Sequence, residues 1–158
     1  MSGPAPGLRT EAADPDQPEA RALLDALSAT LETITGASGR ASFDPGDVRG
    51  AGACFLLARD ADGEAVGCGG YRPLEPGVAE IKRMYARPGT RGVGAALLAA
   101  LERRARADGY AAVRLETRRV NGRAVAFYAR SGYAPVLAWG RYIGRPDAAC
   151  FGKSLRED

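Results

Sequence analysis

Histidine is absent from the sequence, and its absence excludes several kinds of active site. There can be no Ser-His-Asp triad, no Cys-His dyad and no zinc ion held by imidazole ligands. A general base in this chain must therefore be a carboxylate, a lysine or cysteine with a perturbed pKa, a tyrosinate or a positioned water.

Cysteine is scarce. The three thiols, Cys54, Cys68 and Cys150, lie in apolar, strand-like segments and lack the Cys-x-x-Cys spacing of a metal or redox site. We interpret them as buried, reduced thiols of a cytoplasmic protein. We accordingly expect no metal.

Long apolar runs are also missing, so no segment is predicted to span a bilayer. The N-terminus carries proline, glycine and acidic residues where a signal peptide would have a basic start and an apolar run. We therefore expect a cytoplasmic protein without a membrane partner.

Charge of one sign is not in large excess, since the formal net charge is only +3. Basic and aromatic residues do not interleave on a recognisable platform, so we expect no nucleic-acid partner. Arginines do gather in the middle of the chain, at positions 83, 87, 91, 114, 118, 119 and 123. A solvated arginine-rich surface explains this cluster, and a polyphosphate ligand would favour the same field.

At 158 residues the chain is long enough for one domain with a sizeable core. We predict a disordered tail over residues 1–6 and a single domain over residues 7–158. Helical periodicity predicts helices over residues 18–35, 93–108 and 121–130, with a further helical turn near residues 44–48. Strands are predicted over residues 7–12, 54–59, 64–71, 78–86, 111–117, 133–137 and 148–153. This order indicates an α/β (α+β) fold, a mixed sheet with helices on its faces.

A glycine-rich loop joins the strand over residues 78–86 to the following helix. The sequence from Pro88 to Gly94 breaks the strand and opens the helix, in which Leu97, Leu98 and Leu101 form an apolar stripe. Amides from Thr90 to Ala95 at the start of a helix could hold an anion such as a phosphate. An ordinary strand-to-helix turn would use the same glycines.

Glu80 is the first candidate for chemistry. Strand alternation places it on the face opposite Ile81, so that it lies beside a cleft if Ile81 enters the core. A carboxylate there could serve as a general base. A salt bridge between Glu80 and Lys82 is the simpler alternative.

A second candidate segment runs from Asn121 to Tyr133. Its positions Ala124, Phe127 and Tyr128 share one side of a short helix. Asn121 is a good helix N-cap, and Tyr128 could be an ordinary core aromatic with a wet hydroxyl.

Taken together, residues 51–154 resemble the GCN5-related N-acetyltransferase (GNAT) superfamily. The segment at Glu80 resembles the strand that carries the family's catalytic glutamate, the segment Arg91–Leu98 resembles its pyrophosphate loop and helix, and Asn121–Tyr133 resembles its second acetyl-CoA motif. The resemblance implies the acyl-CoA N-acyltransferase fold. That fold has a central, mixed, mostly antiparallel twisted sheet of six to seven strands, flanked by about four helices.

The resemblance also implies a direct transfer of the acetyl group from acetyl-CoA to an amine, without a metal. Glu80 would be the base, directly or through a water, and Tyr128 the acid toward the leaving thiolate. The expected coenzyme contacts are Met84, Tyr85, Ala86, Thr90, Arg91, Gly92, Val93, Gly94, Ala95, Asn121, Phe127 and Tyr128.

One departure concerns the loop pattern, in which the family has Gln or Arg, two residues, Gly, one residue, and Gly or Ala. Aligning the helices puts Gly92 and Gly94 at the last two fixed positions and Gly89 where Gln or Arg should stand. The literal match, Arg91-x-x-Gly94-x-Ala96, would slip the apolar stripe. We favour the helix alignment, which leaves the role of Arg91 open.

The acceptor is expected to be a small-molecule amine, and the arginines favour one that also carries a carboxylate, as an amino acid does. In the resembled family the early helices and the loop between the last two strands shape the acceptor site. Candidate contacts are Arg83, Arg118, Trp139, Arg141 and Tyr142. Dimers are common in that family, so a homodimer is left open.

Two other functions fit parts of the pattern. A non-catalytic acyl-CoA sensor would share the fold, but the presence of both Glu80 and Tyr128 favours catalysis. A dinucleotide-binding enzyme would use Gly92-x-Gly94, but Leu97 stands where its third glycine belongs and the preceding strand follows an antiparallel hairpin.

Overall fold

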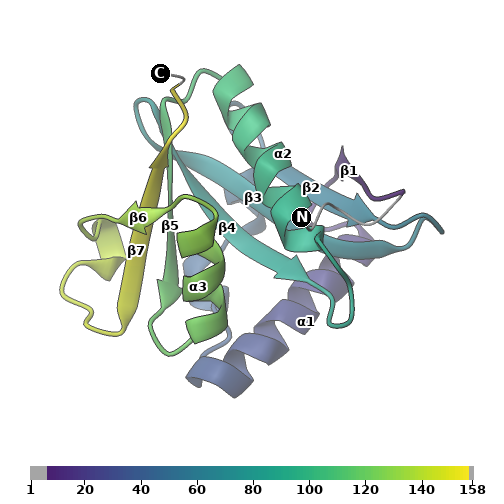
Figure 1. Cartoon of the computed structure of the whole chain (residues 1–158), viewed down its shortest axis with the longest axis horizontal. Coiled ribbons are helices and arrows are strands. Elements are labelled where there is room, and N and C mark those ends of the chain that lie inside the picture. The colour runs from purple at the N-terminus through teal and green to yellow at the C-terminus, as the bar shows by residue number, and fades with distance from the viewer. Residues whose placement is uncertain (1–6, 157–158) are drawn as a thin grey trace.

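A computed structural model describes residues 7–156, so the tail predicted over residues 1–6 lies outside the described residues. Seven strands form one sheet in the order β1-β2-β3-β4-β5-β7-β6 (Figure 1). The strands are β1 Arg9–Ala12, β2 Cys54–Arg59, β3 Ala65–Glu75, β4 Val78–Ala86, β5 Ala112–Arg118, β6 Ala134–Pro135 and β7 Ala148–Ser154. The helices are α1 Pro18–Thr35, α2 Val93–Ala107 and α3 Gly122–Arg130, with short 3-10 helices η1 Arg40–Ser42, η2 Pro45–Val48 and η3 Gly140–Tyr142.

The predicted fold class is confirmed. Neighbouring strands are antiparallel except β4 and β5, which are parallel and are connected through α2. A parallel pair needs such a crossover because its strands run in the same direction. Three α-helices and three short 3-10 helices occur in residues 7–156, where about four helices were expected.

The sheet is buried between α1 on one face and α2 with α3 on the other. Strand β2 shows this directly, because Leu56 and Ala58 pack in the cluster that contains α2, whereas Phe55 and Leu57 pack in the cluster that contains α1. Leu101 of α2 is fully buried, and burying such a side chain contributes about 1.5–3 kcal/mol. Helix α1 begins at Pro18 and ends at Gly36 in the left-handed conformation, as predicted.

Two strands differ from their predicted bounds. Strand β3 runs on to Glu75, past the predicted end at residue 71, and Pro73 is accommodated because the register of β3 shifts between Pro73 and Glu75. Strand β6 has only two residues, where residues 133–137 were expected. It lies at the sheet edge, where Pro135 has no amide to donate.

Strand β4 contains a bulge at the point where it passes the site. Cys68 of β3 pairs with Tyr85 and Gly70 pairs with Lys82, so two β4 residues lie opposite Gly69. Arg83, one of those two, has φ 58°, a left-handed conformation that non-glycine residues rarely adopt. The bulge changes the direction of the side chains that follow it. In the described part of the chain, no helix has the length and apolarity needed to cross a membrane.

Candidate active site

Strands β4 and β5 pair only at their beginnings. Their register covers Val78 with Ala112, Ala79 with Val113, and Glu80 with Arg114, although β4 continues to Ala86 and β5 to Arg118. Beyond Glu80 the two strands diverge, as Figure 1 shows. The edge of β4 that faces β5 therefore carries backbone groups with no partner strand.

A cavity of about 160 Å³, here called the central cavity, lies where the strands diverge. Its walls include Leu27, Leu31 and Thr35 of α1 and also Ala124 and Tyr128 of α3. Since α1 and α3 cover opposite faces of the sheet, the central cavity connects the two faces. Two molecules that approach from opposite sides could meet in it.

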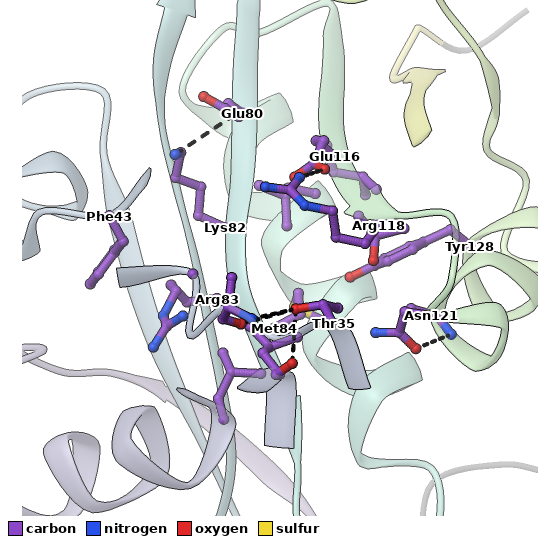
Figure 2. A pocket seen from close by; sticks show the side chains of 18 of the residues that line it. Thr35, Phe43, Glu80, Lys82, Arg83, Met84, Glu116, Arg118, Asn121 and Tyr128 are labelled. Atoms are coloured by element: carbon purple, nitrogen blue, oxygen red, sulfur yellow. Dashed lines mark hydrogen bonds and ion pairs between the residues drawn. The ribbon is translucent and has the colours of Figure 1, made fainter. Parts of the chain in front are cut away.

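The polar face of the site follows from strand alternation. Ile81 of β4 and Leu115 of β5 point into the core cluster with α2. Glu80 and Glu116 consequently lie on the other face, where both line the central cavity (Figure 2). The predicted orientation of Glu80, opposite Ile81, is confirmed.

Glu80 is buried, with 1% of its surface exposed, and it is paired with cations. Arg72 donates to Glu80 Oε1 through Nε at 2.8 Å, and Arg72 Nη2 lies 2.7 Å from the same oxygen. Lys82 Nζ lies 3.8 Å from Glu80 Oε2, and burial lowers the pKa of this lysine. The salt bridge considered from the sequence is therefore present, and Glu80 also reaches the cavity.

Glu116 is a carboxylate that the sequence reasoning missed. It lines the same cavity from β5 and accepts a hydrogen bond from Nη1 of Arg118. The Nε atom of Arg118 lies 3.5 Å from Asp147 Oδ2. Burial raises the pKa of Glu116 above its ordinary range, against the effect of Arg118. Counting alternation outward from Leu115 would have placed Glu116 on the same face as Glu80.

Tyr128 contributes a buried hydroxyl to the central cavity. Its side chain is packed edge-to-face against Phe127 at 5.1 Å and Tyr133 at 5.8 Å between ring centroids. Burial raises its pKa, so the hydroxyl stays protonated at neutral pH. Within residues 7–156 no group forms a hydrogen bond with the Tyr128 hydroxyl, which leaves it available to a ligand.

Asn121 caps the start of α3 and also lines the central cavity. Its Oδ1 accepts a hydrogen bond from the Ala124 amide at 3.3 Å, which confirms the predicted N-cap. Its side-chain nitrogen is directed toward the central cavity, as Figure 2 shows. The cap fixes the orientation of the amide, so this donor is held in place.

The predicted anion-binding loop ends at the N-terminus of α2. Gly89 and Gly92 have φ values of 83° and 71°, which glycine adopts without strain. Gly92 caps α2 without a side-chain hydrogen bond, and the amides of Val93, Gly94 and Ala95 form the first turn of the helix. Such amides have no partner within the helix and carry its partial positive charge. Arg91 is exposed beside them.

The predicted coenzyme contacts fall into three groups. Met84, Asn121 and Tyr128 line the central cavity. Thr90, Arg91, Gly92, Val93, Gly94 and Ala95 lie in the loop and first turn of α2, outside the cavity wall. Tyr85 and Ala86 belong to the part of β4 that pairs with β3 but has no partner strand on the β5 side. Phe127 approaches the start of α2, since a Cβ on Gly94 would lie 3.4 Å from its ring.

The predicted acceptor contacts are only partly brought together. Arg83 lines the central cavity, but its guanidinium donates to Leu24 O at 3.1 Å, Ser28 Oγ at 2.5 Å and Ser38 O at 3.2 Å. It thereby attaches α1 to the β4 bulge. Arg118 is paired with two carboxylates.

Trp139 and Tyr142 stack edge-to-face at 5.4 Å and line a second cavity of about 190 Å³. Tyr142 lines the central cavity too. No group of three or more metal-ligating side chains occurs in the described part of the chain.

Comparison with known proteins gives a consistent match. The model of the acetyltransferase (GNAT) family matches residues 20–133. A protein of Azospirillum brasilense named IAA acetyltransferase is 38% identical over 104 residues, which are 64% of this chain and 67% of the relative.

Solved structures match over almost the whole chain. One from Klebsiella pneumoniae subsp. pneumoniae, provisionally described as an acyl-CoA N-acyltransferase, is 33% identical with a TM-score of 0.79, covering 94% of this chain and 98% of that one. A GNAT family acetyltransferase of Elizabethkingia anophelis with acetyl-CoA bound has a TM-score of 0.66 at 15% identity, over 95% of this chain and 99% of that one, and shares the fold.

Proposed function

The chain belongs to the GNAT family of acetyltransferases, and we propose that it transfers the acetyl group of acetyl-CoA directly to the amine of a small molecule. The observation that carries the proposal is the central cavity. It passes through the sheet where β4 and β5 diverge, and it has two carboxylates on one side and the Tyr128 hydroxyl on the other.

The residues of the site fit a coenzyme A molecule. The amides of Val93, Gly94 and Ala95 suit a pyrophosphate, because a helix N-terminus offers both donors and partial positive charge. The free edge of β4 from Met84 to Ala86 suits the amide-containing pantetheine arm, which can bond to it as a strand would. The Asn121 side-chain nitrogen supplies a further donor. Bound acetyl-CoA supplies an activated thioester carbonyl.

Each polar group then has a task in the transfer. Glu80 takes a proton from the acceptor ammonium, directly or through a water, so that the free amine can attack the thioester carbon. A backbone amide at Tyr85 or Ala86 polarises the carbonyl. As the carbon–sulfur bond breaks, Tyr128 donates its proton to the departing thiolate. Burial raises the pKa of Tyr128, so its hydroxyl carries a proton at neutral pH before the transfer begins.

The dimensions of the site support a small acceptor. The central cavity holds about 160 Å³, and its α1 side combines the apolar Leu27 and Leu31 with the charged Lys82 and Glu116. A small amine with an apolar portion suits this lining.

A thiol-release assay with acetyl-CoA tests the proposal. The panel contains amino acids, polyamines, aminoglycosides and peptides, and release of coenzyme A must depend on the amine and yield the N-acetyl product. Binding of acetyl-CoA without turnover on any amine, equal in wild type and Tyr128→Phe, would favour a sensor over an enzyme. Thermal stabilisation by NADH but not by acetyl-CoA would instead favour a dinucleotide site.

A further inference from the structure

The second cavity, here called the Trp139 cavity, is rich in cations. The cavity has a volume of about 190 Å³. Its wall contains four basic side chains, Arg72, Lys82, Arg114 and Arg141, and two carboxylates, Glu75 and Glu80. The three arginines are charged at any assay pH. The wall therefore carries an excess of positive charge even when Lys82, whose pKa is lowered by burial, is neutral.

Each of the three arginines is held in place by a neighbouring group, but only two of these groups are carboxylates. Arg72 binds Glu80, and Arg114 Nη1 lies 3.4 Å from Glu75 Oε1. Arg141 donates to the Ala41 carbonyl at 2.7 Å, a contact that orients its guanidinium without cancelling its charge. An anion in this cavity would meet donors that are already positioned.

A second observation points to the same ligand chemistry. Trp139 lines the cavity, and its indole Nε1–H is buried with no acceptor among the residues that the structure describes. An unsatisfied buried donor is destabilising, so such groups usually have a partner. An oxygen of a ligand bound beside the indole would supply one. Tyr142 and Leu74 complete an apolar part of the wall.

The Trp139 cavity adjoins the central cavity. Glu80, Lys82 and Tyr142 line both, so a ligand in one lies beside the candidate base of the other. We infer that the Trp139 cavity binds the carboxylate of the acceptor, whose amine reaches Glu80 at the shared wall. The enzyme thus selects amines that carry a carboxylate. This inference rests on the proposed acetyl transfer and specifies its substrate class.

Trp139 is the only tryptophan of the chain, so its fluorescence reports directly on this cavity. Titration with 4-methylpentanoate, a carboxylate without an amine, should change the emission. Its carboxamide, 4-methylpentanamide, should bind about tenfold or more weakly, because it cannot form charge-assisted hydrogen bonds. This readout needs no turnover.

Steady-state kinetics with two acceptors test whether the cavity acts in the reaction. L-Leucine carries a carboxylate, whereas L-leucinamide carries an uncharged carboxamide in its place. We expect the ratio of their kcat/KM values to fall about tenfold or more in Arg114→Gln, and about threefold or more in Trp139→Phe, which keeps an aromatic ring, though a smaller one, and lacks the N–H. Arg103→Gln is the matched control, since Arg103 is exposed on α2, and it should leave the ratio unchanged. The KM for acetyl-CoA should not change in any variant.

The outcomes separate the two proposals. Equal binding of carboxylate and carboxamide, an unchanged ratio in both cavity variants, or a lack of competition between 4-methylpentanoate and leucine would each overturn the inference. Acetylation of amines that carry no carboxylate would then leave the proposed function intact. If carboxylates bind selectively but no amine is acetylated, the proposed function fails and the anion site stands.

Discussion

Arg72 Nη2 lies 2.7 Å from Glu80 Oε1, and the carboxylate that it holds lines both cavities of the molecule. The pair crosses two adjacent strands, because Arg72 of β3 and Glu80 of β4 are direct register partners. With Lys82 on its other oxygen, Glu80 is fixed between two cations at the shared wall. Its position is thus set by the sheet and not by a loop.

Replacing Glu80 by Gln tests its assignment as the general base. Gln keeps an oxygen that can accept from Arg72 but cannot take a proton, so we expect kcat to fall about 100-fold while the KM for acetyl-CoA stays within about twofold. Steady-state thiol release measures both. Glu116→Gln serves as the comparison, and a larger loss of kcat in that variant would transfer the role of base to Glu116.

Tyr128→Phe removes a hydroxyl that has no hydrogen-bond partner in residues 7–156. No protein group is left unsatisfied, so the free energy of unfolding should change by less than about 0.5 kcal/mol. The rate of thiol release should nevertheless fall about 10- to 100-fold at saturating acetyl-CoA. Chemical denaturation and steady-state kinetics on the same preparation check both statements. A large stability loss with normal turnover would make Tyr128 a core residue only.

Gly67→Ala should disturb the start of α2. The added Cβ would lie 2.5 Å from Val93 Cγ1 and 2.7 Å from the Tyr85 carbonyl oxygen, and the carbonyl belongs to a paired strand that cannot move away. We expect a loss of about 1–3 kcal/mol in unfolding free energy and a higher KM for acetyl-CoA. Gly122→Ala, where a Cβ meets nothing within 4 Å, is the control and should be tolerated. Unchanged stability in the first variant would contradict the packing described here.

Arg83→Met tests whether Arg83 stabilises the packing of α1 on β4 or contacts the acceptor. The guanidinium holds two carbonyls and Ser28, yet its Nε is buried without a partner among the described residues and its burial lowers its pKa. We expect the bonds to outweigh that cost, so that the variant loses about 1–3 kcal/mol of stability with little change in acceptor KM. Arg21→Met, on the exposed side of α1, is the control. A raised acceptor KM with normal stability would make Arg83 a substrate contact.

The stability of Glu116→Gln relative to wild type should depend on pH. Burial raises the folded-state pKa of Glu116 above its ordinary 4.5, so the fold favours the protonated form. The stabilisation from this group is complete below about pH 4.5 and is lost as pH rises through the raised pKa. Gln does not titrate, so its unfolding free energy should rise relative to wild type between about pH 4 and pH 8. A difference that decreases over this range would show that Arg118 more than compensates for burial.

The sequence was sufficient for the order of elements and for the face of the sheet on which Glu80 lies, since these depend on local periodicity. Alternation placed Glu80 opposite Ile81, and the Asn121 cap was predicted from its position before a helix. The contacts that define the cavities join residues from different elements, so local periodicity does not predict them. Arg72 reaches Glu80 through strand pairing, and Trp139, which precedes η3, lines the same cavity as Arg114 of β5 although the two are 25 residues apart in the chain.

The partners of arginines were hardest to predict. Arg83 and Arg118 were expected to bind an acceptor, because their charge suits a carboxylate. In the fold, one donates to α1 and the other pairs with Glu116 and Asp147. A sequence states that a guanidinium is present, but its partner depends on tertiary distances and on the bulge that turns Arg83 toward α1.

The place of β7 has a consequence for the order in which the protein is completed during synthesis. Strand β7 lies between β5 and β6 in the sheet although it follows both in the chain. The strand that carries Arg114 and Glu116 therefore has no neighbour on that side until Ala148–Ser154 has left the ribosome and inserted. A nascent chain can form the antiparallel β1–β4 part of the sheet early, but the polar wall of the candidate active site is completed only when the last strand is added.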